Sequence, residues 1–223
     1  MKKAIILNAG PRKNFNTATL LKEARKGAEA AGAETEFINL FDLNYKGCIS
    51  CFACKLKGNT TNGLCAYKDE LRPVLEKIVA SDAVIIGSPV YYSYPTGTFR
   101  NLMERMLFAA SSYMIDEETG LFLRRLKRRI PTGLIFTMNI TKDLYKHVNY
   151  HTILGANADS LDNLYGYCEI LNSYDTYQFS DYSKYECNMF NEQHKSEVRD
   201  AQFPVDMEQA FNLGKRLVEM NLE

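Results

Sequence analysis

The chain has 223 residues, of which 46% are hydrophobic, 12% aromatic and 24% charged, a composition that excludes a disordered, collagen-like or low-complexity protein. Basic and acidic residues both number 27, so the formal net charge is zero. This balance argues against a nucleic-acid binder, because affinity for a phosphate backbone needs clustered cations. The sequence has no apolar run that would span a bilayer and no signal peptide at its start, so we expect a cytoplasmic protein that binds neither nucleic acid nor membrane.

Predicted strands and helices alternate along the chain. Short apolar runs predict buried strands at 2–7, 36–40, 83–87, 132–138 and 164–171. Apolar residues at helical spacing predict helices over 17–31, 71–79, 99–110 and 207–218. Asn16 or Thr17 is expected to cap the first helix, and Asp69 the second. Residues 142–160 have only weak helical character.

This alternation predicts an α/β fold. We expect a doubly wound sheet of five parallel strands with helices on both faces, in the flavodoxin-like arrangement, and a single domain over 1–223. Two segments do not fit that plan: the cysteine loop (44–65) and the aromatic arm (172–203), an irregular stretch rich in Tyr and Phe. We interpret the arm as packing on its own domain or on a partner subunit, with a lid over the active site as the alternative.

The loop after the first predicted strand, residues 8–17, opens directly into a helix. Backbone N–H groups and the helix dipole favour a phosphate at such a position, and Arg12 adds a fork of donors. The loop has neither a GxGxxG nor a Walker A pattern, which leaves a monophosphate ligand. The alternative is that Asn16 and Thr17 cap the helix while Arg12 and Lys13 are solvated.

The loop after the third predicted strand, residues 88–97, carries two prolines and three tyrosines. It leaves the same edge of the sheet as the first loop. A planar aromatic ligand would lie against such a segment. The alternative is that the tyrosines pack the loop onto its own helix.

Together these loops carry a family resemblance. Asn-x-Gly-Pro-Arg-Lys-x-x-Asn-Thr at 8–17 and Gly-Ser-Pro-Val-Tyr-Tyr at 87–92 resemble the NADPH-dependent FMN reductase family of flavodoxin-like proteins. The resemblance covers about residues 1–140. It implies an FMN site in which the first loop holds the phosphate, the second runs along the isoalloxazine ring, and the loop after the fourth strand completes the site. The implied residues are Gly10, Arg12, Asn16 and Thr17, then Pro89, Val90, Tyr91 and Tyr92, then Thr137, Met138 and Asn139. The chain departs from the family at Gly10, where Ser is usual, and at Phe15, where Gly is common.

Four of the six cysteines crowd into the cysteine loop, as Cys48-x2-Cys51-x2-Cys54-x10-Cys65. This spacing resembles the iron–sulfur flavoprotein branch of the family, but its last gap is longer. Four thiolates suit a [4Fe–4S] cluster or zinc, and metal-free thiols are the third interpretation. Of the remaining cysteines, Cys168 is expected in the core.

The functional expectation is an FMN-dependent oxidoreductase that passes electrons from NAD(P)H through FMN to a quinone, a nitro or azo compound, a flavin or a protein acceptor. In such chemistry the flavin relays the electrons, and no catalytic acid–base residue is expected. The alternative is an iron–sulfur flavoprotein that carries electrons between protein partners. The family resemblance and the aromatic arm favour a homodimer or higher homo-oligomer. The basic run at 124–129 is interpreted as a solvated helix face, with contact to the 2′-phosphate of NADPH as the alternative.

Overall fold

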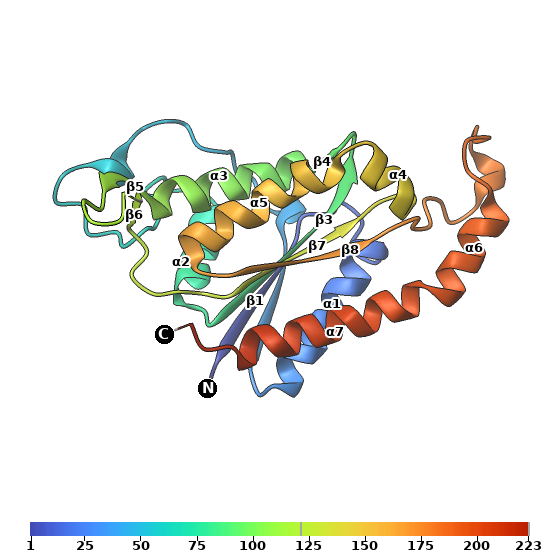
Figure 1. Ribbon diagram of the computed structural model, residues 1–223, viewed down its shortest axis with the longest axis horizontal. Helices are drawn as coiled ribbons and strands as arrows, with labels where there is room; N and C mark the ends of the chain where they lie inside the picture. The colour runs from blue at the N-terminus through green and yellow to red at the C-terminus, as the bar shows by residue number, and fades with distance from the viewer. Residues whose placement is uncertain (121, 223) are drawn as a thin grey trace.

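A sheet of five parallel strands runs through the centre of the computed structural model, which describes residues 1–120 and 122–222 (Figure 1). The strands are β1 (Lys3–Asn8), β2 (Glu34–Asn39), β3 (Ala83–Tyr91), β7 (Thr132–Thr137) and β8 (Cys168–Ser173). Their order across the sheet is β2-β1-β3-β7-β8. This order is that of a flavodoxin-like doubly wound sheet and confirms the expected fold class.

Helices cover both faces of the sheet (Figure 1). One layer contains α1 (Asn16–Ala30) and α7 (Phe203–Glu219), and the other contains α2 (Leu71–Ala80), α3 (Gly97–Ala110) and α5 (Tyr150–Tyr165). Each layer buries its own apolar core against the sheet. Two short helices, α4 (Lys142–His147) and α6 (Glu192–Ala201), lie at the edge where the parallel strands end. Within the described residues, no helix is long and apolar enough to cross a membrane.

The segment expected to be a loop at 88–97 is largely a hairpin. Strand β3 continues to Tyr91 and pairs antiparallel with β4 (Tyr94–Pro95). Tyr92 and Ser93 form the two-residue turn, with positive φ angles of 47° and 77°. Such a turn matches the twist of the strands it joins, although Asn-Gly is its usual sequence.

Other expectations about local structure were wrong. The segment expected to be weakly helical contains two helices, α4 and α5, because Thr141 accepts a hydrogen bond from the Leu144 N–H and α5 buries one face through Leu154 and Leu161. Strand β8 therefore begins at Cys168. The connector before β7 contains a second hairpin, and the aromatic arm contains α6 and the short helix η3 (Tyr182–Lys184).

The second hairpin pairs β5 (Ser111–Ile115) with β6 (Phe122–Arg124), and its second strand enters the basic run 124–129. That run is therefore no helix face. Within it, Arg128 forms an ion pair with Asp82 at 2.6 Å.

Candidate cofactor site

A cavity of about 400 Å³, the cofactor cavity, lies at the carboxyl ends of β1, β3 and β7. It is lined by every residue that the sequence analysis assigned to FMN: Gly10, Arg12, Asn16, Thr17, Pro89, Val90, Tyr91, Tyr92, Thr137, Met138 and Asn139. Parallel strands end at the same edge, so the loops that follow them meet there. The cavity also has lining residues that the sequence analysis missed, namely Pro11, Phe15, Ile140, Tyr150, Thr176, Gln178 and Phe190.

The first loop and the β3–β4 hairpin approach each other closely at Gly10. The Gly10 N–H donates to Asn8 Oδ1 at 3.0 Å. A Cβ at this position would lie 3.1 Å from Asn8 Oδ1 and 3.2 Å from Pro89 Cδ. A glycine here lets the two loops form adjacent walls of the cavity.

The start of α1 carries no side-chain cap. The N-cap residue is Phe15, so the expectation that Asn16 or Thr17 caps this helix was wrong. Thr17 Oγ1 instead contacts Thr137 Oγ1 at 2.7 Å, which joins the first loop to the end of β7. The first N–H groups of a helix are the ones that bind an anion, and here no side-chain cap takes them.

The aromatic arm holds two of the polar side chains of the first loop. Arg12 Nη1 donates to the Gln178 carbonyl at 2.7 Å, and Asn16 Nδ2 donates to the Tyr177 carbonyl at 2.8 Å. Asn16 Oδ1 accepts from Arg199 at 2.8 Å. The arm therefore packs on its own chain and forms one wall of the cavity.

Arg12 is further fixed by its surroundings. Its guanidinium carbon lies 3.7 Å from the centroid of the Phe15 ring. Burial lowers the pKa of Arg12, although Tyr91 and Tyr185 oppose this effect. The guanidinium remains a cation, since arginine is not deprotonated in proteins.

Just after the end of β7, one side-chain oxygen has no hydrogen-bond donor in the described part of the chain. Asn139 Oδ1 is buried and has no hydrogen-bond partner among the described residues. The Asn139 carbonyl accepts from Lys195 Nζ at 2.6 Å, and the Met138 carbonyl accepts from Thr176 Oγ1 at 3.1 Å. A buried acceptor that no protein group satisfies, at the wall of a cavity, fits a ligand that offers an N–H or O–H donor.

The tyrosines of the hairpin do not pack onto the following helix. Tyr92 is 98% exposed, Tyr94 is 61% exposed and Tyr91 is 47% exposed. The hairpin therefore presents aromatic surface at the mouth of the cavity, where a planar ligand could lie against it.

The four clustered cysteines line a second, smaller cavity, the cysteine cavity, together with residues of α3. Cys51 is exposed and Cys54 is buried, and burial raises the pKa of the Cys54 thiol. Within the described residues, no three Cys, His, Asp or Glu side chains are arranged as metal ligands. The thiols thus face one cavity, which fits a four-thiol donor set, but they are not drawn together around a common point.

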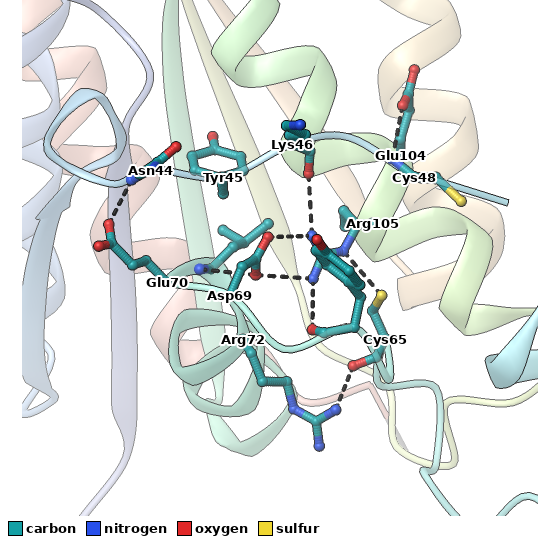
Figure 2. A network of polar contacts seen from close by, with 12 residues as sticks. Asn44, Tyr45, Lys46, Cys48, Cys65, Asp69, Glu70, Arg72, Glu104 and Arg105 are labelled. Carbon is teal, nitrogen blue, oxygen red and sulfur yellow. Dashed lines mark hydrogen bonds and ion pairs between the residues drawn. The ribbon is translucent and has the colours of Figure 1, made fainter. Parts of the chain in front are cut away.

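A buried arginine fixes both ends of the cysteine loop (Figure 2). Arg105 Nη1 donates to the Lys46 carbonyl at 3.1 Å, ahead of the loop's first cysteine, and to Asp69 at 2.8 Å. Its Nη2 donates to the Tyr67 carbonyl at 3.0 Å, and its Nε donates to Cys65 Sγ at 2.9 Å. The sequence analysis missed Arg105, because its partners lie 36–59 residues away along the chain.

The fold and the position of the cofactor cavity define a flavodoxin-like α/β protein with a ligand site at the carboxyl edge of the sheet. The sequence profile of the NADPH-dependent FMN reductase family matches residues 1–123, and the chain belongs to this family.

Curated relatives each match about half of the chain. An iron-sulfur flavoprotein of Archaeoglobus fulgidus is 38% identical over 107 residues, which are 48% of this chain and 50% of that protein. An iron-sulfur flavoprotein of Methanocaldococcus jannaschii is 36% identical over 118 residues, 53% of this chain and 58% of that protein. The chain spans about half the length of the curated relatives it matches.

Solved structures share the fold at low sequence identity. The NAD(P)H:quinone oxidoreductase from Methanothermobacter marburgensis has a TM-score of 0.67 at 16% identity, over 97% of this chain and 98% of that one. An FMN-dependent NADH-azoreductase from Bacillus anthracis, in complex with FMN, has a TM-score of 0.63 at 16% identity, over 98% of this chain and 100% of that one. These similarities establish the fold.

Proposed function

We propose that the chain is an FMN-dependent NAD(P)H oxidoreductase whose FMN occupies the cofactor cavity. The observation that carries this proposal is the meeting of the two family motifs, 8–17 and 87–92, around one cavity. Membership of the NADPH-dependent FMN reductase family supports it, as does the FMN-bound azoreductase of the same fold.

The cavity suits the two chemically different ends of FMN. At one side, the uncapped start of α1 and the Arg12 guanidinium provide donors for a phosphate. At the other, the exposed tyrosines of the hairpin provide aromatic surface, and Asn139 Oδ1 is an acceptor for the ring N–H of a flavin. Gly10 allows the first loop and the hairpin to approach closely, because a Cβ there would lie 3.2 Å from Pro89 Cδ.

The chemistry that FMN would supply there is electron transfer from NAD(P)H to a quinone, a nitro or azo compound, a second flavin or a protein acceptor. The protein's own contribution is to hold the phosphate through Gly10, Arg12, Asn16 and Thr17. Pro89, Val90, Tyr91, Tyr92, Thr137 and Asn139 would position the ring. No side chain is assigned a proton-transfer role. We further propose a single cytoplasmic domain that works as a homodimer or higher homo-oligomer.

The test of this proposal is Arg12→Ala, with Lys13→Ala as its matched control. Lys13 is the neighbouring cation and forms an exposed ion pair with Asp42. Removing charge-assisted hydrogen bonds to the phosphate should raise the FMN Kd by about 10- to 100-fold in Arg12→Ala, and the Lys13 variant should bind as the wild type does. Quenching of FMN fluorescence on binding measures the FMN Kd of both variants. Equal FMN affinity in all three proteins would remove Arg12 from the site.

A second candidate function rests on the cysteine cavity. Relatives named iron-sulfur flavoprotein and four thiols around one cavity favour an electron carrier with a [4Fe–4S] cluster held by Cys48, Cys51, Cys54 and Cys65. Zinc on the same thiols, or no metal, are the alternatives.

One spectrum separates these functions. The visible absorption of anaerobically purified protein is recorded, with iron and zinc assayed on the same sample. Flavin bands without iron support the reductase with free thiols, whereas flavin bands on a broad iron–sulfur background support the carrier. In the second case Cys51→Ser should lose iron and keep flavin. A colourless protein that does not take up added FMN would contradict both.

A further inference from the structure

A third cavity, the arginine cavity, lies beside the cysteine cavity, with which it shares Cys48, Glu104 and Phe108, and apart from the cofactor cavity. It has a volume of about 1220 Å³ and shares no lining residue with the cofactor cavity. It runs beside α3, between the β5–β6 hairpin and the C-terminal half of α5, and Figure 1 shows α3 and α5 side by side in this layer. A volume of this size accommodates a molecule as large as a nucleotide.

Two arginines that form no ion pair among the described residues line this cavity. Arg124 Nη1 is buried without a hydrogen-bond partner, and neither Arg124 nor Arg129 forms an ion pair within the described residues. Burial lowers the pKa of Arg124, and the nearby Arg129 lowers it further. Arg129 is exposed, so the cost of burial falls on Arg124, whose Nη1 donor is buried and unsatisfied.

The two carboxylates on the cavity wall are already engaged. Glu104 Oε1 pairs with Arg100 at 3.3 Å, and its Oε2 accepts from the Cys48 N–H at 3.1 Å. Asp116 Oδ1 accepts from the backbone N–H groups of Glu118 and Thr119, at 3.1 and 2.9 Å. Neither carboxylate forms an ion pair with Arg124 or Arg129, so these two guanidinium groups have no acidic partner on the described cavity wall.

The fold holds Arg129 in place through a glycine. Gly166, which ends α5, has a φ of +102°, and a Cβ there would lie 2.9 Å from Arg129 Cγ. The apolar stem of Arg129 thus packs on the bare backbone of Gly166. This packing fixes the stem of a cation that lacks an ion-pair partner.

We infer that the arginine cavity binds a phosphate-bearing small organic molecule, with Arg124 and Arg129 on the phosphate. A phosphate monoester carries nearly two negative charges and accepts bidentate hydrogen bonds from guanidinium groups. Leu107 and Phe108 offer apolar surface to the body of the ligand, and Ser160 offers a hydroxyl. The phosphate could come from the 2′-phosphate of NADPH, a source that rests on the proposed function, or from a separate phosphorylated metabolite.

The direct test is calorimetric titration of the intact protein with adenosine 2′,5′-bisphosphate, in excess FMN so that the cofactor cavity is occupied. Adenosine, which lacks both phosphate groups, is titrated as the uncharged control ligand. Arg124→Gln and Arg129→Gln should each raise the Kd of the bisphosphate at least about tenfold, and Arg129→Lys should retain most of the affinity. Lys127→Gln is the matched control, because Lys127 is an exposed cation of the same run and does not line the cavity. Melting temperatures check that the variants fold.

Absence of bisphosphate binding to the wild type, or an equal loss in Lys127→Gln, would overturn the inference. If the phosphate belongs to the hydride donor, Arg129→Gln should raise the KM for NADPH at least about tenfold and leave that for NADH unchanged. If it belongs to a separate ligand, both KM values should stay the same while bisphosphate binding is lost. Arg12→Ala should leave bisphosphate binding intact, so failure of the proposed FMN site and failure of this inference give different results.

Discussion

At the scale of single residues, Arg105 does the most to shape the cysteine loop. It is 2% exposed and donates to backbone carbonyls on both sides of the four cysteines, at Lys46 and Tyr67, as well as to Asp69 and Cys65 (Figure 2). Asp69 also accepts from the Leu71 N–H at 3.2 Å, at the start of α2. One guanidinium therefore links α3, the loop and α2, and the loop's position over the cysteine cavity depends on it.

Arg105→Met should destabilise the protein strongly. The substitution keeps an apolar side chain but removes the guanidinium donors, so the carboxylate of Asp69 loses its ion-pair partner. Breaking a buried ion pair costs about 3–5 kcal/mol in the free energy of unfolding. Arg100→Met is the control, since Arg100 lies on the same helix and makes one exposed ion pair, with Glu104 at 3.3 Å. That pair is worth less than about 1 kcal/mol. Urea unfolding measures both, and similar small losses in the two variants would contradict the assigned role of Arg105.

At the scale of elements, the contact between α1 and α7 is made by backbone. A Cβ at Gly27 would lie 1.8 Å from the Phe211 carbonyl oxygen, and one at Gly214 would lie 1.9 Å from the Ala24 carbonyl oxygen. The two helices can approach this closely only because both positions are glycine. The sequence analysis recognised the apolar face of each helix but had no local signal for their mutual distance.

Gly27→Ala should therefore destabilise the protein although alanine favours helices. Overpacking costs up to about 3 kcal/mol when backbone has to move, and the gain in helix propensity is only about 1 kcal/mol. We expect a net loss of about 1–2 kcal/mol in the free energy of unfolding. Gly155→Ala in α5 is the control, because a Cβ there meets nothing within 4 Å. It should gain about 0.5–1 kcal/mol. Equal effects in denaturant unfolding would show that the helices tolerate the methyl group.

The parallel strands and the cofactor cavity were predictable from local pattern. Continuous apolar runs mark strands buried on both faces, and the loops that follow them must share one edge. The two hairpins were not predictable in this way, since the Tyr92-Ser93 turn lacks the usual Asn-Gly signal. Helix α5 was missed because its buried positions begin at Leu154, late in a segment whose first half is polar. Gln178 and Phe190 could not be assigned to the cavity, because their place there depends on contacts between distant parts of the chain.

At the scale of the whole molecule, the aromatic arm connects the last strand to the first loop. Its anchor is Lys195, which is 1% exposed, pairs with Asp175 and donates to the Asn139 carbonyl at 2.6 Å. Asp175 also contacts His194 Nε2 at 2.6 Å. The same arm bonds Arg12 through Gln178. Figure 1 shows the arm and α6 at the edge where the parallel strands end, so one C-terminal segment braces two of the three loops around the cofactor cavity.

Lys195→Ala should release this arm without unfolding the sheet. The variant leaves Asp175 buried without its cation, which costs about 3 kcal/mol or more locally and should raise the population of the open arm on the order of 100-fold. Limited digestion with chymotrypsin reports that opening, because the arm is rich in tyrosine, and it should cleave within 172–203 correspondingly faster. If FMN occupies the cavity, its dissociation should speed up too, since the arm forms one wall.

The control is Lys146→Ala, because Lys146 is an exposed lysine of α4; this variant should change neither the cleavage rate nor the rate of FMN dissociation. Unchanged cleavage in Lys195→Ala, with circular dichroism equal to the wild type, would mean that the arm is held by its aromatic packing and not by the buried ion pair.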